Sequence, residues 1–305
     1  MNPTVSIGLP VAQEPIDYIR EAIRSVQNQS LTDWELIVIA DGSPDITRNY
    51  LTALKDPRIR VYLRRSSLGL AARLNEIPGL AHGEFLARMD ADDIMHPKRL
   101  EHQVTVLRDN PSVDLLSSRA VVIDEDKTVL GITRPAPRTV EQASMLTSTP
   151  FIHPTVIART AWWHAHRYDA QYLRSEDKAF WIIAANDSSF LREDRVALFY
   201  RVARSLNPTK YARSARCERK IIRRFGPGIV GRVRTQRIIG WSLTKQIVIA
   251  AASKLGQEDR VTSRRYASLT DEQKRELSIT LQRALAAADH DLPVFPDLDA
   301  RGSSS

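Results

Sequence analysis

The chain has 305 residues, of which 43% are hydrophobic and 26% charged. This length suffices for one large core, or for a domain of about 200 residues with a smaller one, and the apolar content is ordinary for a soluble globular protein. The single cysteine, Cys217, excludes an internal disulfide framework and favours a reducing compartment. Residues 1–15 have neither the basic start nor the apolar core of a secretion signal, so we expect a cytoplasmic protein.

The net charge of +8 is distributed unevenly along the chain. Residues 1–200 carry 23 Lys and Arg against 26 Asp and Glu, residues 201–265 carry 17 against 3, and residues 266–305 carry 4 against 7. The chain therefore has a near-neutral body, a basic arm of net charge +14 and an acidic tail. A basic arm of this kind indicates an anionic surface or ligand.

Apolar residues alternate along the body between runs typical of strands and runs with helical spacing. The strand-like runs cover residues 4–11, 35–40, 59–63, 83–89 and 113–118. Helical patterns fall between them, at residues 16–30, 46–54, 68–81 and 97–110. Strands separated by helices of this length indicate βαβ units, and hence an α/β fold with a mostly parallel sheet. On such sheets, ligands bind beyond the carboxyl ends of the strands.

Acidic residues follow three of these strands at the position where a ligand is expected. Glu14 follows the first strand, Asp41 ends the second, and Asp90, Asp92 and Asp93 follow the fourth. The alternatives are a turn at Asp41 and a capped helix start after the three aspartates. One helix start needs one carboxylate, whereas three crowded carboxylates raise one another's pKa unless a cation is present. The pattern therefore favours a divalent metal with oxygen ligands and a phosphate-bearing substrate.

Seven motifs occur in the order and spacing of one enzyme family: VSIGLPVAQE, ELIVIADGSPD, LGLAARLN, GEFLARMDADD, FIHPTVI, SEDKAFW and ALFYRV. With them, residues 3–205 resemble the inverting glycosyltransferases of family 2, which include bacterial enzymes that build surface polysaccharides. The resemblance implies a GT-A domain at residues 1–205, with a Rossmann-like nucleotide-binding half (1–118) and an acceptor-binding half (119–205). It also implies transfer of a sugar from a nucleotide-diphosphate donor, with UDP the leading nucleotide and GDP the next.

The resemblance assigns residues to the donor and the metal. We expect Asp92 to ligate Mn²⁺ or Mg²⁺, which neutralises the departing diphosphate. Asp90 is expected at the ribose or beside the metal, Asp41 at the base, and Pro10 and Glu14 beneath the nucleotide. Two roles stay open for Asp93: a ligand of the metal, or a cap of the helix that follows.

Two cations lie close in sequence to these carboxylates. Arg88 stands two residues before Asp90, so a strand directs both side chains to the same side. We expect Arg88 and Arg73 on the donor side, where Arg88 either separates the aspartates electrostatically or positions the diphosphate. An ordinary salt bridge is the alternative for both, and it is favoured for Arg73.

The sequence departs from the family pattern beside the nucleotide. Relatives commonly have Pro-x-Tyr-Asn-Glu, whereas this chain has Pro10-Val11-Ala12-Gln13-Glu14. The missing tyrosine removes a stacking partner for the base, which leaves the donor less defined. In the third motif region, Ser67 stands where relatives often have asparagine.

The second half of the body is expected to supply the general base. Residues 175–185 have the pattern of a helix capped by Ser175, and first-turn carboxylates at Glu176 and Asp177 suit the helix dipole without any catalytic role. By family resemblance, Asp177 is the base and Glu176 binds acceptor hydroxyls. Burial beside Phe180 would raise the pKa of this base toward neutrality. A single base without a nucleophilic partner implies one displacement with inversion.

Two further residues are assigned by their place between the motifs. His153, before a proline, is either a structural turn residue or a ligand of the metal or diphosphate. Trp163, in the segment AWWHAHRYD, either stacks on an acceptor sugar or belongs to the core. We expect His153 at the metal and Trp163 at the acceptor.

The basic arm continues into the run RIIGWSLTKQIVIAAASKL, which is too short and polar to span a bilayer comfortably. A basic segment with a tryptophan and an aliphatic face is typical of a membrane interface. This favours a peripheral enzyme on the inner face of the plasma membrane with a lipid-linked acceptor, such as a polyprenyl-diphosphate saccharide. The alternative is a helical subdomain that covers the end of the sheet. Residues 206–288 are predicted as a basic helical C-terminal region, with a capped helix from Thr270, and residues 289–305 as disordered.

Three rival functions remain at this stage. An RNA-binding protein would use the arginine-rich arm, but this leaves the acidic motifs at strand ends unexplained, so we expect no nucleic-acid partner. A metal-dependent nucleotidyltransferase or phosphohydrolase would use the aspartates for phosphate chemistry. A catalytically inactive sugar-nucleotide binder is disfavoured because both carboxylate motifs are intact.

Overall fold

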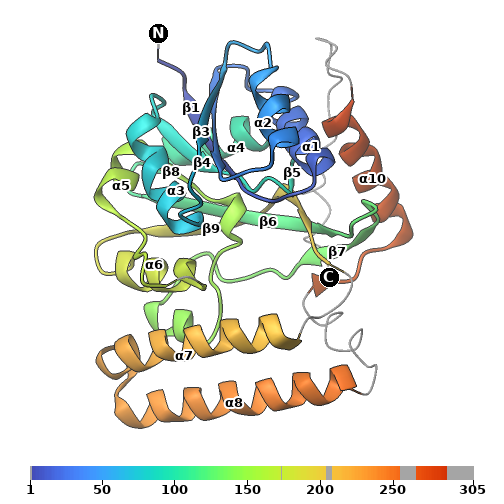
Figure 1. The fold of residues 1–305 in the computed structure, drawn as a ribbon. Coiled ribbons are helices and arrows are strands. Elements are labelled where there is room, and N and C mark those ends of the chain that lie inside the picture. The colour runs from blue at the N-terminus through green and yellow to red at the C-terminus, as the bar shows by residue number, and fades with distance from the viewer. Residues whose placement is uncertain (1, 173, 204–207, 255–265, 287–305) are drawn as a thin grey trace.

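A single curved sheet with helices on both faces forms the body of the protein (Figure 1). The computed structural model describes residues 2–172, 174–203, 208–254 and 266–286. The strands are β1 Val5–Val11, β2 Trp34–Asp41, β3 Ile59–Arg64, β4 Phe85–Arg88, β5 Ile94–Met95, β6 Leu115–Ile123, β7 Val129–Thr133, β8 Ile157–Arg159, β9 Phe190–Arg201 and β10 Tyr266–Ala267. The α-helices are α1 Ile16–Gln27, α2 Asp45–Thr52, α3 Leu70–Glu76, α4 Arg99–Asp109, α5 Thr160–Ala165, α6 Glu176–Ala184, α7 Pro208–Val230, α8 Arg232–Lys254 and α10 Asp271–Leu285. Short 3-10 helices are η1 Ile77–Leu80, η2 Gln142–Leu146 and η3 His153–Thr155.

The first half of the sheet is parallel, as the alternation of strands and helices predicts. Strand β1 pairs in parallel with β2 and β4, and β2 pairs in parallel with β3. The second half is mixed, because β8 is antiparallel to both β4 and β6, and β7 is antiparallel to β6. The expected parallel pairing therefore holds from β1 to β4 and again between β6 and β9, whereas β7 and β8 are antiparallel to their neighbours. Strands β6 and β7 are joined by a short hairpin, which permits only antiparallel pairing.

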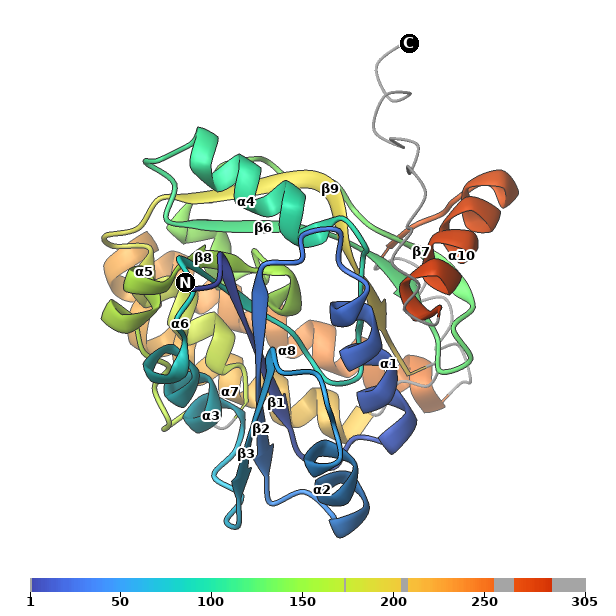
Figure 2. The same ribbon diagram turned by 90° about the horizontal axis from the view of Figure 1, so that it is seen from above.

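Alternate residues of β2 enter two different cores. Leu36, Val38 and Ala40 belong to the core under α1 and α4, whereas Ile37 and Ile39 belong to the core under α3, α5 and α6. Figure 2 shows α1 and α2 on one side of β1–β3 and α3 on the other. A strand buried on both faces is a continuous apolar run, which is why ELIVIA has no polar alternation.

The C-terminal segment returns to the sheet. Strand β10 pairs antiparallel with β7, and α10 buries Leu277, Leu281 and Ala284 in a third core beside β5, β6, β7 and β9. The predicted start of α10 is confirmed, since Thr270 and Gln273 form a reciprocal capping box. The Asn28 side chain at the end of α1 donates to the carbonyls of Ala284 and Ala286.

Helices α7 and α8 form a hairpin on the far side of α6 from the sheet (Figure 1). Among the described residues, no helix has the length and apolarity required to cross a membrane. The predicted disorder of residues 289–305 lies outside the described residues. The fold therefore has the α/β character and the C-terminal helical extension expected from the sequence.

Candidate active site

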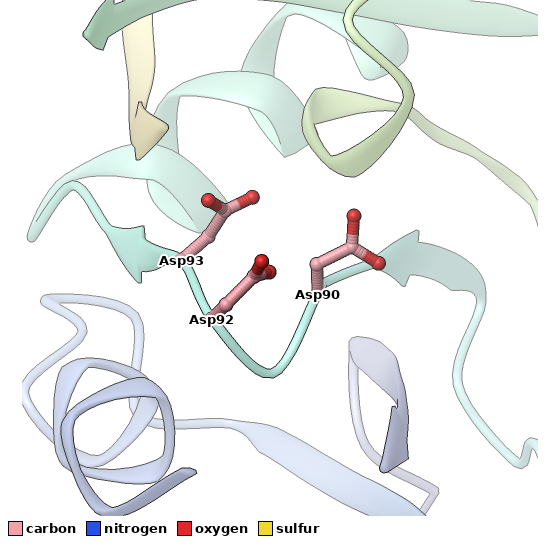
Figure 3. A group of neighbouring side chains, drawn as sticks. All are labelled: Asp90, Asp92 and Asp93. Carbon is pink, nitrogen blue, oxygen red and sulfur yellow. The ribbon is translucent and has the colours of Figure 1, made fainter. Parts of the chain in front are cut away.

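The three aspartates of the DADD motif lie on a tight loop between β4 and β5. The backbone N–H of Asp93 donates to the carbonyl of Asp90 at 3.3 Å, which closes the loop on itself. Carboxylate oxygens of Asp90, Asp92 and Asp93 all lie within 4.8 Å of one another. Figure 3 shows their side chains projecting to the same side of the loop. Three carboxylates are thus held together at the carboxyl end of a central strand.

This arrangement is electrostatically costly without a cation. Burial, with the charges of Asp90 and Glu14, raises the pKa of Asp92 to about 6. Burial and the two neighbouring aspartates raise the pKa of Asp93 well above its ordinary value. One oxygen of Asp93 accepts from the backbone N–H of Arg201 at 2.9 Å, but its other oxygen is buried and has no hydrogen-bond partner in the described part of the chain.

These features fit a hard divalent cation. An all-oxygen donor set suits Mg²⁺ or Mn²⁺, and a positive charge would satisfy the unpartnered oxygen of Asp93. The helix-cap alternative for Asp93 is wrong, because α4 begins only at Arg99 and the carboxylate of Asp93 bonds to β9 instead.

Arg88 supplies the positive charge nearest to the cluster. Its guanidinium contacts Asp90 twice, with Nη2 2.6 Å from Oδ1 and Nη1 3.1 Å from Oδ2, and only 4% of its side chain is exposed. Nε of Arg88 has no hydrogen-bond partner among the residues that the structure describes. Such a bidentate pair fixes the direction of the Asp90 carboxylate. Arg88 therefore forms a salt bridge, which was one of the alternatives expected for it, and a contact between Arg88 and the diphosphate stays a prediction.

Asp41 organises the loop that follows β3. Its carboxylate accepts hydrogen bonds from Nε of Arg73 at 2.7 Å, from the backbone N–H groups of Leu68 and Gly69 at 2.9 Å each, and from Ser67 Oγ at 3.1 Å. Burial raises the pKa of Asp41, but the bonds from Leu68, Arg73 and Gly69 outweigh it and hold the pKa below its ordinary value. Asp41 is therefore an anion at neutral pH, with four donors around it.

Arg73 is the buried partner of this carboxylate. It also donates to Glu76 Oε2 at 2.9 Å and to the carbonyl of Ser66 at 2.7 Å, and its side chain is 6% exposed. The ion pair between Arg73 and Asp41 is the salt bridge that the sequence analysis favoured for Arg73. The network shapes the Ser67–Gly69 loop, which borders the cavity described next.

Two neighbouring cavities surround the carboxylates. The first, of about 300 Å³, is lined by Pro10, Val11, Ala12, Glu14, Asp41, Ser67, Gly69, Leu70, Arg73, Asp90, Ala91 and Asp92. The second, of about 390 Å³, is lined by Leu68, Gly69, Leu70, Ala71, Ala72, Ala170, Tyr172, Arg174, Ser175, Glu176 and Ser214. Both cavities share Gly69 and Leu70. Six of the predicted donor and metal residues thus line one cavity, and Glu176 lines the adjoining one.

Glu176 and Asp177 open helix α6 beside this pair of cavities. Burial raises the pKa of both carboxylates, and the charge of Asp177 adds to the effect at Glu176. The charge of Asp90 also raises the pKa of Glu176, while Arg88 opposes the increase at both residues. Ser175 does not cap the helix by its side chain and has a left-handed backbone, with φ of 60°. The capping expectation for Ser175 is wrong.

Asp177 follows Glu176 in the first turn of α6, and the described lining of the two cavities does not include it. One oxygen of Asp177 accepts from the backbone N–H of Lys178 at 2.8 Å. The charges of Asp177, Glu176 and Asp90 all raise the pKa of the Tyr168 hydroxyl, to which burial makes the largest contribution, while Arg88 lowers it. Carboxylates from the two halves of the body therefore act electrostatically on one tyrosine.

His153 is part of this buried centre but lies outside the carboxylate cluster. Its Nε2 is 2.6 Å from the Tyr168 hydroxyl, and its ring meets Trp181 edge to face at 5.4 Å. Burial, and to a smaller extent Arg88, lowers the pKa of His153 well below its ordinary value, so the imidazole is neutral at pH 7. Within the described residues, the group with metal-ligand spacing comprises the three aspartates alone.

Trp163 lies in the packed core. It is 5% exposed, its Nε1 donates to the carbonyl of Leu86 at 3.0 Å, and its ring stacks on Phe180 at 5.8 Å. Trp163 is therefore a core residue, and the expectation that it stacks on an acceptor sugar is wrong, because neither face of its ring is open to a sugar. No spacing or charge pattern in the sequence distinguishes Tyr168, Tyr172 and Arg174. The fold brings Tyr172 and Arg174 to the second cavity and the Tyr168 hydroxyl to His153.

A comparison with family models matches residues 6–162 to Glycosyl transferase family 2, just over half of the chain. An uncharacterized glycosyltransferase of Methanocaldococcus jannaschii, MJ1057, is 31% identical over 209 residues, which cover 66% of this chain and 71% of the relative. The chain belongs to glycosyl transferase family 2, as the seven motifs indicate. Its class is that of a glycosyltransferase.

Solved structures share the fold. Mannosyltransferase PcManGT from Pyrobaculum calidifontis, in complex with GDP-Man and Mn²⁺, superimposes with a TM-score of 0.60 at 16% identity, covering 93% of this chain and 86% of that chain. S. aureus TarS 1–349, in complex with UDP-GlcNAc, gives 0.55 at 17% identity, covering 94% and 82%. At these identities the likeness concerns the fold alone, which is the expected GT-A fold.

Proposed function

We propose that the protein is a metal-dependent inverting glycosyltransferase that moves a sugar from a nucleotide diphosphate to a saccharide acceptor. The observation that carries the proposal is the pair of adjoining cavities, with Asp92 in the first and Glu176 in the second. A sugar bound where they meet, at Gly69 and Leu70, would lie between the diphosphate side and the acceptor side.

The first cavity is proposed to hold the nucleotide diphosphate. Asp92 and Asp90 would hold Mn²⁺ or Mg²⁺, with Asp93 adding its unpartnered oxygen. When bound, the ion neutralises the charge that develops on the leaving diphosphate. Arg88 fixes the direction of the Asp90 carboxylate through its two contacts. These side chains are proposed to position the donor phosphates before transfer begins.

The nucleoside is proposed to lie against Pro10, Glu14 and the Asp41 loop. The Asp41 carboxylate accepts four hydrogen bonds within the chain, so a contact with the base requires either a shared oxygen or a shift of the Ser67–Gly69 loop. Arg73 acts here by holding Asp41, and its proposed role is to position this loop. Ala12 and Gln13 leave the base without the tyrosine common among relatives.

Asp177 is proposed as the general base. Its carboxylate would take the proton from the acceptor hydroxyl as the glycosidic bond breaks, while Glu176 binds neighbouring acceptor hydroxyls in the second cavity. Burial raises the pKa of Asp177, which makes it a stronger base than an exposed aspartate. Because one base without a nucleophile supports one displacement, the anomeric configuration would invert.

The donor is proposed to be a UDP-sugar, with a GDP-sugar next. Two proteins with this fold bind UDP-GlcNAc and GDP-Man, the latter with Mn²⁺, and this supports a nucleotide-sugar donor without selecting between them. The acceptor is proposed to be lipid-linked, in the assembly of a surface or extracellular polysaccharide, as for the bacterial enzymes that the motifs resemble. His153 is proposed to act indirectly, by positioning the Tyr168 hydroxyl that lies 2.6 Å from its Nε2.

A binding screen tests the proposal directly. Calorimetry with UDP- and GDP-sugars, in the presence of Mn²⁺ or of EDTA, should give metal-dependent binding of one donor. Incubation of that donor with polyprenyl-diphosphate saccharides should then release a nucleoside diphosphate and form a glycosidic bond of inverted configuration, measured by NMR. Release of free phosphate or pyrophosphate without a glycosidic product would instead favour a phosphohydrolase or nucleotidyltransferase. Absence of any nucleotide-sugar binding would overturn the proposal.

A further inference from the structure

Helix α8 forms the outermost layer of the protein. Helix α7 lies between it and the body, as Figure 1 shows, and buries Ile221 and Ile222 in the core that contains α6. Helix α8 packs on α7 through Ile239 and Thr235. Thr235 lies against Gly226 of α7, where a Cβ atom in place of the glycine hydrogen would lie 2.8 Å from the threonine side chain. One face of α8 is therefore occupied by α7.

The opposite face of α8 exposes several large apolar side chains. Val233 is 70% exposed, Trp241 69%, Ile247 70% and Val248 56%. Surface helices normally place polar residues opposite their packed face. A cluster of large apolar side chains on the outermost helix indicates contact with something that is itself apolar.

Basic residues accompany these apolar residues. Residues 208–254 contain twelve lysines and arginines against the single acidic Glu218, a net charge of +11. On the outer side of α8, Arg234, Arg237, Trp241, Lys245 and Val248 follow one another at spacings of three or four residues and are all exposed. This spacing places them in one stripe along the helix.

We propose that this face of α8 docks on an anionic lipid bilayer, with Trp241, Ile247 and Val248 entering the interface and the basic stripe contacting the headgroups. Trp, Lys and Arg are the side chains that anchor proteins at such interfaces. Each basic residue near an anionic surface strengthens binding about fivefold. A second copy of the chain would bring two surfaces of like charge together. A nucleic acid would leave Val233 and Ile247 without an apolar partner.

Docking through α8 would bring the cavity that contains Glu176 close to the membrane surface. Ser214 of α7 lines the cavity that also contains Glu176, so this cavity adjoins the hairpin whose outer helix meets the lipid. A saccharide carried on a membrane lipid would reach Glu176 and Asp177 without leaving the bilayer surface. This consequence rests on the proposed function, whereas the docking itself does not.

Tryptophan fluorescence of the full chain provides a direct test. Of the five tryptophans, Trp34, Trp162, Trp163 and Trp181 are 2%, 7%, 5% and 0% exposed, so only Trp241 can enter a bilayer. Vesicles of equal parts phosphatidylglycerol and phosphatidylcholine should shift the emission to shorter wavelength, and bromine on the acyl chains should quench it. Vesicles of phosphatidylcholine alone should bind more weakly. Trp241→Phe should abolish both signals while co-sedimentation with the vesicles persists.

Matched variants separate charge from apolar contact. Arg234→Gln/Arg237→Gln/Lys245→Gln should weaken vesicle binding on the order of 100-fold, and Trp241→Ser/Ile247→Ser about 10- to 100-fold. The control Arg20→Gln/Arg48→Gln/Lys55→Gln removes the same charge on and beside α1 and α2, at two exposed positions and one partly exposed position, and should leave vesicle binding nearly unchanged. Circular dichroism and nucleotide-sugar binding should be unaltered in all three, which separates loss of docking from loss of fold or of donor binding.

Three results would overturn the inference. One is equal co-sedimentation of wild type and the α8 variants. Another is a dimer in sedimentation velocity that the Trp241→Ser/Ile247→Ser variant dissociates. The third is salt-sensitive binding to RNA with no quenching by brominated lipid. Vesicle binding without detectable sugar transfer would leave the docking intact and count against the proposed function alone.

Discussion

The guanidinium of Arg88 and the carboxylate of Asp90 meet through two contacts, of 2.6 and 3.1 Å, at the end of β4. Only 4% of the arginine side chain and 27% of the aspartate side chain are exposed. Arg88 is the last residue of β4, and Asp90 lies two residues further on, in the tight loop that follows the strand. Arg88 thus supplies a positive charge beside the three crowded carboxylates.

Removing that charge should destabilise the protein. Arg88→Gln leaves Asp90, Asp92 and Asp93 without their nearest cation, and we expect the free energy of unfolding at pH 7 to fall by roughly 3–5 kcal/mol. Denaturant titration measures this. The control is Arg108→Gln, whose pair with Glu84 is half exposed on both sides and should contribute less than about 1 kcal/mol. Equal losses in the two variants would contradict the role given to Arg88.

Asp92→Asn should abolish metal-dependent donor binding, because the amide removes the negative charge that the cation needs. Calorimetry with the nucleotide sugar and Mn²⁺ measures the loss, and EDTA should produce the same loss in the wild type. Asp109→Asn, an exposed aspartate at the end of α4, should bind as the wild type does. Donor binding that persists in Asp92→Asn would remove Asp92 from the metal site.

Asp177→Asn should bind the donor normally and lose transfer. A general base contributes on the order of 10²- to 10⁴-fold, so kcat should fall by that amount with little change in the donor Kd. Single-turnover kinetics separate the two quantities. Wild-type turnover in this variant would exclude Asp177 as the base, and an equal loss in Glu176→Gln alone would transfer the role to Glu176.

The transfer rate should depend on pH through the same carboxylate. Burial raises the pKa of Asp177 above 3.8, and the base must be ionised to accept a proton. The rate should therefore fall as the pH decreases through this raised pKa, at higher pH than for an exposed aspartate. A pH profile of kcat with saturating donor measures the midpoint. A rate that stays constant down to pH 4 would contradict a buried carboxylate base.

Arg73→Lys tests the loop that Asp41 holds. Lysine keeps the charge but cannot contact Asp41, Glu76 and the carbonyl of Ser66 at once, as the arginine does. We expect donor binding to weaken by about tenfold or more, since the Ser67–Gly69 loop lines the nucleotide cavity. Arg65→Lys, an exposed neighbour in the same loop, is the control and should bind normally.

Sequence periodicity was sufficient for the parallel half of the body. Helix α1 and strand β2 lie where the spacing of apolar residues predicts them. A helix buried on one side has apolar residues three or four positions apart, and a strand buried on both faces is a continuous apolar run. The three aspartates were also recognisable, since their crowding is local. The order of the antiparallel strands β6–β8 was not predictable, because pairing between distant segments leaves no spacing signal.

The sequence by itself determined the carboxylates at the ends of β1, β2 and β4, the capped helix α10 and the charge of the basic arm. Tertiary structure alone decided that Trp163 lies in the core, that Tyr168 joins His153 to the charged centre, and that Trp241 faces outward. Local features are fixed by neighbours along the chain, and each can be inferred from a few residues. The exposure and partners of a side chain depend on segments that are distant in the sequence, and only the folded chain brings these together.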